Sequence, residues 1–331
     1  MSKIYYLGID IGGTKCAVTV AEKEKMNIIA KKAFPTDNGR DYRAVIDEII
    51  KTAHSLFDEN GVSPESVLAA GISCGGPLNS RTGVIMSPPN LPGWDNVPVC
   101  DILKNEFGFP VFLQNDANAC ALAEWKFGAG QGCENMVFLT FGTGMGAGLI
   151  LNGRLYTGAN DMAGEAGHIR LRENGPVGYG KAGSFEGFCS GGGIARNAKM
   201  KARELLGKGV TTSLFKDEND IERITAKSLA EAAENGDGFA AEIYSECGRE
   251  LGRGLAVLID ILNPELIVIG SIYARSENLL RESMLASLKE EALGVSLSAC
   301  RTVPAALGEK TGDYAALGTA AHGYERMMKD E

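Results

Sequence analysis

The chain carries near its start the stretch Gly8-Ile9-Asp10-Ile11-Gly12-Gly13-Thr14-Lys15. Short β-branched runs at Ile4–Asp10 and Ala17–Glu22 flank its glycines and predict a strand, a tight turn and a second strand. Glycines permit unusual backbone angles and close approach of a ligand. The pattern fits a phosphate-binding hairpin, with backbone N–H groups and Thr14 facing phosphate oxygens and Asp10 holding a hydrated Mg²⁺ ion. An ordinary β-hairpin explains it equally well.

A second glycine turn is Phe141-Gly142-Thr143-Gly144-Met145-Gly146-Ala147-Gly148, between strands expected at Met136–Phe141 and Gly146–Leu151. One such hairpin is weak evidence. Two hairpins, each with Thr at the turn and each opening its half of the chain, favour phosphate binding in one cleft between two lobes. By contrast, Gly178–Gly183 spells G-x-G-x-x-G outside any strand–helix unit, so it does not indicate a dinucleotide site. The chain also lacks the G-x-x-x-x-G-K-[ST] nucleotide loop.

Outside these turns, short β-branched runs alternate with segments of helical spacing. Further strands are expected at Ile28–Phe34, Val67–Cys74, Val111–Leu113, Ile169–Leu171 and Leu266–Ile269. Helices are expected at Tyr42–Phe57, Asp101–Phe107, Ala117–Phe127, Ser190–Leu206, Ala226–Glu234, Phe239–Leu262, Glu277–Leu288 and from Tyr314 onward. This alternation predicts an α/β architecture in two lobes. We expect a small lobe over 1–116, with a helix at about 313–331 packing back on it, and a larger lobe over 117–312.

The composition argues against several classes of protein. The 331 residues include 33 Lys and Arg against 42 Asp and Glu, for a formal net charge of −9, and an acidic chain is a poor binder of nucleic acid. No signal-like segment precedes Asp10, and the longest apolar stretch, Leu255–Leu262, is too short to cross a bilayer. Eight cysteines without a C-x-x-C pair indicate reduced thiols. We therefore expect a cytoplasmic protein with neither a nucleic-acid nor a membrane partner.

The run Gln114-Asn115-Asp116-Ala117-Asn118 follows a short apolar strand and precedes a helix. Phosphoryl transfer to an alcohol needs a group that orients the hydroxyl and accepts its proton. Asp116 is our candidate for that base. Alternatively, Asn115 or Asp116 only caps the helix, as these residue types often do. The spacing alone does not decide between the two roles.

Four runs occur in a characteristic order: Asp10–Lys15, Pro89-Asn90-Leu91-Pro92-Gly93-Trp94, Asn115–Asn118 and Gly164-Glu165-Ala166-Gly167-His168. Together they resemble the ROK family (repressors, open reading frames, kinases), and its bacterial glucokinases in particular. The likeness runs from about Ile4 to Gly323, which is nearly the whole chain.

The resemblance implies a two-lobed actin-like (ribonuclease H-like) fold with an interdomain cleft where ATP and a sugar meet. It implies phosphorylation of a hexose hydroxyl, with glucose O6 as the expected acceptor and Asp116 as the general base. The residues it matches to sugar binding are Gly76, Asn90, Asn115, Asp116, Glu165, His168 and Glu186. Those matched to the nucleotide are Asp10, Gly12, Gly13, Thr14, Lys15, Gly142, Thr143, Gly144 and Gly270. ATP and Mg²⁺ are the expected cofactors, with Asp10 holding the metal through water, and a homodimer is the expected assembly.

One feature departs from the family's pattern. Many members hold a structural zinc ion with one histidine and three cysteines, but the three cysteine positions here are Val177, Tyr179 and Ser184. Since His168 alone cannot hold tetrahedral zinc, we expect no zinc site. We expect packing around Tyr179 and Phe185 to hold this loop instead.

Several alternatives stay open. The family's repressors carry a helix-turn-helix ahead of the first strand; this chain reaches its Gly-Gly turn by Gly12, so we expect no DNA-binding domain. The other functional hypotheses are a kinase for N-acetylmannosamine, fructose or another sugar, a non-catalytic sugar sensor, and a structural actin-like protein. The motifs do not decide between ATP and polyphosphate as the phosphate donor.

Overall fold

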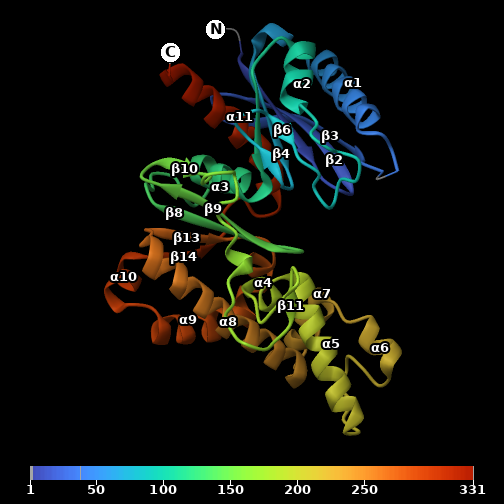
Figure 1. Cartoon of the computed structure of the whole chain (residues 1–331), viewed down its shortest axis with the longest axis vertical. Helices are drawn as coiled ribbons and strands as arrows, with labels where there is room; N and C mark the ends of the chain where they lie inside the picture. The colour runs from blue at the N-terminus through green and yellow to red at the C-terminus, as the bar shows by residue number, and fades with distance from the viewer. Residues whose placement is uncertain (1–2, 38, 331) are drawn as a thin grey trace. The chain divides into compact units, whose positions relative to one another are not determined.

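The computed structural model describes residues 3–37 and 39–330, and the chain divides into two compact units. The first unit comprises Met1–Gly132, Gly148–Ala163 and Glu309–Glu331. The second comprises Cys133–Ala147 and Gly164–Gly308. Each unit contains strands and helices in alternation, which confirms the expected α/β architecture (Figure 1).

The first unit is built on a five-stranded sheet with the order β3-β2-β1-β4-β7. The strands β1 (Tyr5–Ile11), β2 (Lys15–Glu22) and β3 (Asn27–Pro35) pair antiparallel, whereas β4 (Val67–Cys74) and β7 (Val111–Asn115) run parallel to β1. The central strands β1, β2 and β4 are buried along nearly their whole length, as expected of apolar runs covered on both faces. The short strands β5 (Leu78–Asn79) and β6 (Val84–Ile85) form a separate hairpin.

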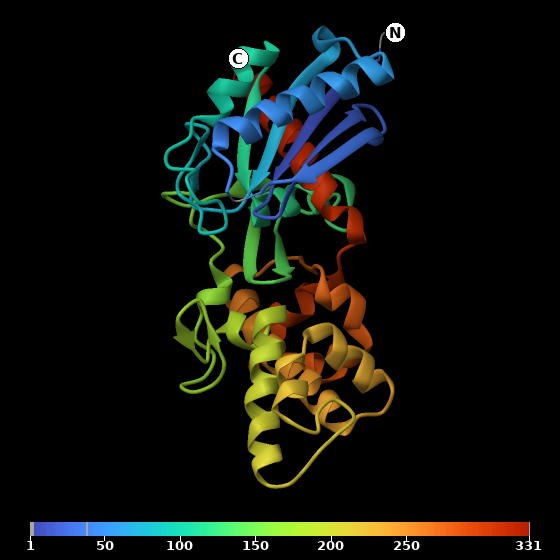
Figure 2. The same ribbon diagram turned by 90° about the vertical axis from the view of Figure 1, so that its right-hand side faces the viewer.

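Helices cover both faces of this sheet (Figures 1 and 2). On one face α1 (Tyr42–Asn60) packs on β2 and β3, and α2 (Val99–Phe107) packs on β7. On the other face α11 (Thr311–Asp330) lies against β1 and β4, with α3 (Asp116–Phe127) beside it. Neighbouring residues of a strand point to opposite faces, so Leu7 of β1 joins the core under α1 and α2, and Tyr6 joins the core under α11.

The second sheet has the order β10-β9-β8-β13-β14, and the boundary between the units falls within β9. Its strands are β8 (Met136–Phe141), β9 (Met145–Leu151), β10 (Arg154–Tyr156), β13 (Leu266–Ile269) and β14 (Arg301–Pro304). A small hairpin of β11 (Val177–Gly178) and β12 (Lys181–Ala182) lies apart from it.

The remaining helices belong to the second unit. They are α4 (Phe185–Phe188), α5 (Gly191–Gly207), α6 (Glu218–Glu222), α7 (Ala226–Glu234), α8 (Gly238–Leu262), α9 (Ile272–Glu291) and α10 (Gly294–Ala299). Helices α8 and α9 pack closely because α8 has glycine at their contact: a Cβ added to Gly252 would lie 2.4 Å from the carbonyl oxygen of Met284. Among residues 3–37 and 39–330, no helix offers an apolar stretch of the length that a bilayer crossing needs.

One expected strand is wrong. Ile169–Leu171 forms no strand; its only sheet-like contact is an isolated bridge between Arg170 and Ser184. The reason is local, because Leu171 N donates to the carbonyl of Gly183 at 2.8 Å instead of to a neighbouring strand. The segment therefore closes a loop onto itself.

Gly71 of β4 lies where α11 touches the sheet and gives a test of this packing. A Cβ on Gly71 would lie 2.1 Å from the carbonyl oxygen of Ala316 and 2.3 Å from the backbone nitrogen of Ala320. We predict that Gly71→Ala lowers the free energy of unfolding in urea by about 1–3 kcal/mol, because α11 must shift. The control Gly312→Ala, on α11 itself, meets no atom within 4 Å and should change stability by less than about 0.5 kcal/mol. Equal stability of the two variants would contradict the close approach.

Candidate active site

The carboxyl ends of β1, β4 and β7 bring together acids that lie far apart in the sequence. In the parallel register Asp10 of β1 lies opposite Ser73 of β4, and Ser73 lies opposite Gln114 of β7. Asp116 follows β7 directly, as the first residue of α3. Ligands of open α/β sheets bind outside the carboxyl ends of the parallel strands. The sheet therefore places Asp10 and Asp116 where a ligand is expected.

The surroundings of these two carboxyl groups shift their protonation. Partial burial, helped by the negative charge of Asp116 and opposed by Lys15, raises the pKa of Asp10 from 3.8 to about 6. Desolvation by the surrounding protein also raises the pKa of Asp116, although the N–H of Ala117 stabilises its charged form. The Asp116 side chain is nevertheless exposed to solvent, so it is accessible to a substrate.

The acids also indicate how a metal would be held. A dication near Asp10 would favour the charged carboxylate that burial and Asp116 disfavour, so this donor fits Mg²⁺. Within the described residues, no cluster of three or more His, Cys, Asp and Glu side chains is placed to hold an ion directly. Mg²⁺ usually keeps several water ligands and binds through one or two carboxylates and substrate phosphates. The carboxylate of Asp10, acting through water, is consistent with this coordination preference of Mg²⁺.

In the structure, Asn115 and not Asp116 caps helix α3. Asn115 is the N-cap of α3, and its side-chain oxygen accepts a hydrogen bond from Asn118 N at 2.8 Å. Asp116 Oδ1 accepts a hydrogen bond from the N–H of its neighbour Ala117 at 2.8 Å. Because Asn115 caps the helix, Asp116 is not needed for that purpose.

The first glycine turn packs against the loop that carries Asn90. Gly12 N donates to the Lys15 carbonyl at 3.1 Å and closes the turn between β1 and β2. A Cβ on Gly13 would lie only 2.5 Å from the carbonyl oxygen of Asn90, so glycine is required at this contact. A Cβ on Gly75 would likewise meet the Asn90 amide at 3.3 Å. These predicted residues therefore adjoin, while Thr14 and Lys15 are exposed at the turn and Gly76 directly follows Gly75.

In the second unit, the predicted sugar-binding residues border the start of β9. The segment Gly164–His168 lies on this strand: a Cβ on Gly167 would be 2.2 Å from the carbonyl of Met145. Glu165 and His168 are exposed on this segment. The Glu186 side chain joins them, because its Oε2 accepts from Met145 N at 3.1 Å. Gly144, just before Met145, also lies against Glu186.

The loop between His168 and Glu186 is held partly as expected. Phe185 is fully buried, and Ser184 caps α4. Tyr179, however, is 80% exposed, so the expectation that it packs inside the loop is wrong; its ring stands edge-on, 6.2 Å from the ring of His168. The absence of zinc stays a prediction that rests on the missing cysteines.

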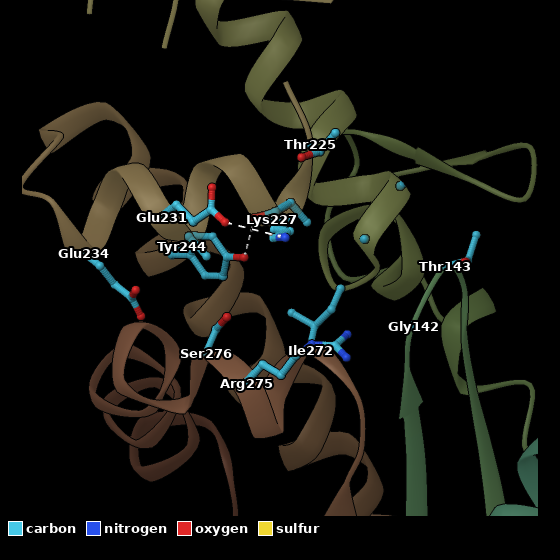
Figure 3. Close-up of a pocket in the computed structure, with 14 residues that line it drawn as sticks. Gly142, Thr143, Thr225, Lys227, Glu231, Glu234, Tyr244, Ile272, Arg275 and Ser276 are labelled. Atoms are coloured by element: carbon cyan, nitrogen blue, oxygen red, sulfur yellow. Dashed lines mark hydrogen bonds and ion pairs between the residues drawn. The ribbon is translucent and has the colours of Figure 1, made fainter. Parts of the chain in front are cut away.

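A pocket of about 750 Å³ opens in the second unit (Figure 3). The second glycine turn and the first turn of α5 border it with Gly142, Thr143, Gly191 and Gly192, and α7, α8 and α9 supply most of the remaining lining. Gly191 N donates to the Gly142 carbonyl at 2.8 Å, so the turn and the helix start are joined. The N-terminal end of a helix favours anions such as phosphate.

Only part of this pocket could be predicted from the sequence. Of the predicted nucleotide residues, Gly142 and Thr143 line it, whereas Gly144 and Gly270 do not. Gly270 directly follows β13, and its N–H donates to Leu139 O at 2.9 Å. The chain then enters α9, which carries the lining residues Ile272, Arg275 and Ser276. The start of α5 was not predicted as part of this site, although its run of three glycines was a usable signal. Residues of α7 and α8 gave no such signal.

Known proteins resemble this chain over nearly its whole length. A family model described as ROK family matches residues 6–322. Glucokinase from Thermotoga maritima is 35% identical over 282 residues, which are 85% of this chain and 86% of that protein. The ROK hexokinase structure from Thermus thermophilus has a TM-score of 0.77 and 29% identity, over 98% of this chain and 100% of that chain. A ROK family glucokinase from Streptomyces griseus, in complex with glucose and AMPPNP, has a TM-score of 0.74 and 30% identity, over 96% and 100% respectively.

The raised pKa of Asp10 predicts a pH-dependent stability. The folded chain holds this proton more tightly than the unfolded chain, so the charged carboxylate destabilises the fold above a pH of about 6. We expect Asp10→Asn to raise the free energy of unfolding by about 2 kcal/mol at pH 8, with partial solvent screening taken into account. The gain should shrink as the pH falls below about 6 and should vanish below about 3, where both the folded and the unfolded chain hold the proton.

Urea unfolding of both chains across this pH range measures the difference. The exposed Asp58 of α1 supplies a matched change, and Asp58→Asn should alter stability by less than about 0.5 kcal/mol. A stabilisation by Asp10→Asn that is the same at pH 4 and pH 8 would rule out charge as its cause.

Proposed function

This chain belongs to the ROK family, and from that premise we propose that it is an ATP-dependent sugar kinase whose acceptor is glucose O6. The observation that carries the proposal is Asp116, which is exposed at the carboxyl ends of parallel strands and is relieved of helix capping by Asn115. The full-length match to ROK kinases also confirms the expected actin-like fold.

We propose that Asp116 is the general base. It would orient the acceptor hydroxyl and take its proton as the new O–P bond forms and the bond from the γ-phosphorus to ADP breaks. Desolvation raises its pKa, and a more basic carboxylate accepts a proton more readily. A base of this kind contributes about 10²–10⁴-fold to the rate.

The sugar would be held by short polar side chains. Glu165, His168 and Glu186 of the second unit each offer groups that donate or accept in fixed directions, as a ring of hydroxyls requires. The contact between Glu186 and Met145 N supports this role, because it fixes the carboxylate beside the second glycine turn. Asn90, Asn115 and the backbone of Gly76 would do the same in the first unit.

The pocket of Figure 3 would hold ATP. The Gly142–Thr143 turn and the start of α5 would face its phosphates, and Ile272 and Ala230 would supply apolar surface for the base. The turn at Gly12–Lys15 of the first unit would bind phosphate oxygens through its backbone N–H groups. Magnesium, when bound, neutralises phosphate charge, and Asp10 would hold its water shell. The use of ATP rather than polyphosphate stays a prediction, which a comparison of the two donors would test. The homodimer also stays a prediction, which light scattering would test.

Substitution of the base tests the proposal. We predict that Asp116→Asn lowers kcat for ATP and glucose by at least about 10²-fold, because proton transfer is lost, while glucose binding stays within about threefold. A coupled assay for ADP and calorimetric titration with glucose measure the two effects. Asp101→Asn, in the first turn of α2, changes an exposed acid at a similar helix position and should leave kcat unaltered. Near-normal turnover in Asp116→Asn would refute the assignment.

Filling the pocket tests the nucleotide site. Ala230 of α7 lines it, so Ala230→Phe should raise the KM for ATP by about tenfold or more, whereas the KM for glucose changes little. Ala232→Phe, on the same helix and outside the lining residues, is the control. If both variants keep the KM for ATP of the unaltered chain, the nucleotide binds elsewhere.

A further inference from the structure

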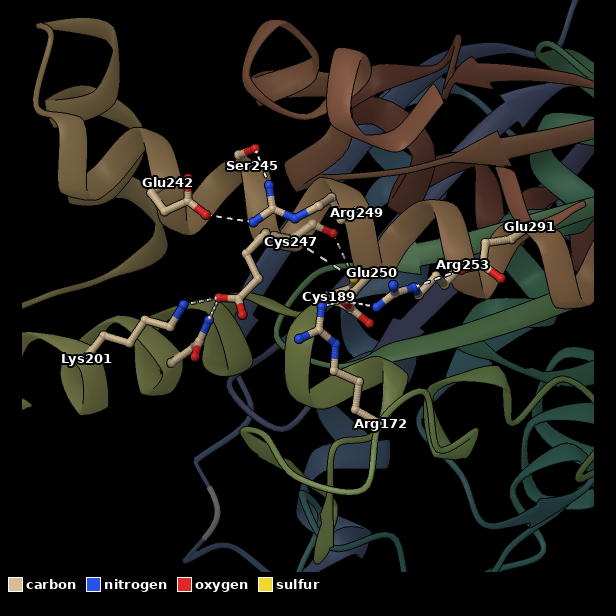
Figure 4. Close-up of polar contacts among 12 residues, drawn as sticks. Arg172, Cys189, Lys201, Glu242, Ser245, Cys247, Arg249, Glu250, Arg253 and Glu291 are labelled. Carbon is tan, nitrogen blue, oxygen red and sulfur yellow. Dashed lines mark hydrogen bonds and ion pairs between the residues drawn. The ribbon is translucent and has the colours of Figure 1, made fainter. Parts of the chain in front are cut away.

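A buried charge fastens the loop after His168 to helix α8 (Figure 4). Arg172 in the loop forms an ion pair with Glu250 through Nη2 and Oε1. The Glu250 side chain has no solvent exposure, whereas that of Arg172 is 38% exposed. A buried carboxylate requires a partner, because leaving it alone in a low dielectric is strongly unfavourable. The loop therefore contributes the charge that a core helix needs.

The same carboxylate has a second partner. Arg253 Nη1 reaches Glu250 Oε1 at 2.9 Å, and Arg253 Nε reaches Glu291 of α9 at 3.2 Å. The guanidinium of Arg172 also lies 5.6 Å from the ring centroid of Phe188, within the range of a cation–π contact. Since Arg253 remains when Arg172 is removed, Glu250 would still be paired and the fold should survive.

Backbone hydrogen bonds connect the segment of Arg172 to the neighbours of His168 and Glu186. Arg172 N donates to the carbonyl of Gly183 at 3.1 Å, and Phe185 N donates to the carbonyl of Ile169 at 2.7 Å. The two ends of the loop are thus tied to each other directly after His168 and directly before Glu186. A shift of Arg172 would move both ends together.

A second contact docks the loop one helical turn further along α8. The ring of Phe185 packs on Gly254: a Cβ on Gly254 would lie 2.3 Å from the ring. Phe185 precedes Glu186 in sequence, and Gly254 follows Glu250 by one turn. Apolar packing resists separation of the two surfaces but allows sliding, whereas the ion pair between Arg172 Nη2 and Glu250 Oε1 joins one defined pair of atoms.

We propose that Arg172 is a positioning residue for sugar binding: by pairing with Glu250, it holds His168 and Glu186 in register on the second glycine turn. This inference rests on the proposed function, since it assumes that these two residues hold the sugar. The loop then needs no metal ion to be ordered, because a buried ion pair and an aromatic ring supply the attachment.

Arg172→Met tests this proposal, with Arg249→Met as a matched control. Arg249 also lies in an ion pair on α8 and is 40% exposed, but its partner Glu242 is 61% exposed. We expect Arg172→Met to raise the KM for glucose by about tenfold or more, because misplaced binding groups lose their contacts. The KM for ATP should stay within about twofold. Arg172→Lys keeps the positive charge but replaces the guanidinium. Its KM for glucose should lie between those of the unaltered chain and of Arg172→Met.

Amide hydrogen exchange gives a readout that needs no sugar. Residues 169–187 should exchange faster in Arg172→Met, and not in Arg249→Met, while α8 keeps its protection. An unchanged KM for glucose together with unchanged exchange, or an equal rise in both KM values, would overturn the proposal. Should Arg172→Met fail to fold, Arg172→Lys is judged by the same two measurements. Failure of the unaltered chain to phosphorylate glucose would instead refute the proposed function, and the exchange experiment would still test the attachment.

Discussion

Two negative charges held close together at one edge of a sheet are the constraint on which the first unit depends. The parallel register of β1, β4 and β7 places Asp10 and Asp116 there, and burial, together with the negative charge of Asp116, raises the pKa of Asp10 to about 6. An arrangement of this kind destabilises the empty protein and becomes favourable when a cation binds. The helix cap at Asn115 relieves Asp116 of that structural role.

Under the proposed function, the second unit meets a different requirement, because it must place backbone and side-chain donors around an anionic and a polyhydroxylated ligand. Glycines stand wherever two backbones come together, as at Gly167 on Met145 and at Gly191 on Gly142. Polar contacts with this backbone orient the side chains beside it. For example, Met145 N donates a hydrogen bond to Glu186 Oε2. The loop that carries Arg172 is held in another way, by the ion pair of Arg172 with the buried Glu250 of α8.

Local signals explain what the sequence predicted. The glycine turns, the apolar strand before Asn115 and the helical spacing of α1 are short-range patterns, so the α/β architecture and the acids at the strand ends could be anticipated. Both failures lie in the loop between His168 and Glu186, whose internal contacts no short-range pattern marks. The strand at Ile169–Leu171 was wrong because its partners lie in its own loop. The packing expected of Tyr179 was wrong because this side chain is exposed, whereas the ring of Phe185 packs on Gly254 of α8. No pattern could reveal which residue on α8 receives Arg172.

The central claim is that this chain moves a phosphoryl group from ATP to a sugar hydroxyl. Phosphorus NMR of the unaltered chain with ATP, Mg²⁺ and glucose tests it most directly, because the spectrum identifies the product and the oxygen that carries the phosphate. We predict loss of the γ-phosphorus signal with matching growth of glucose 6-phosphate and ADP. Inorganic phosphate in place of a sugar phosphate, or an unchanged ATP spectrum in the presence of glucose, would contradict the account.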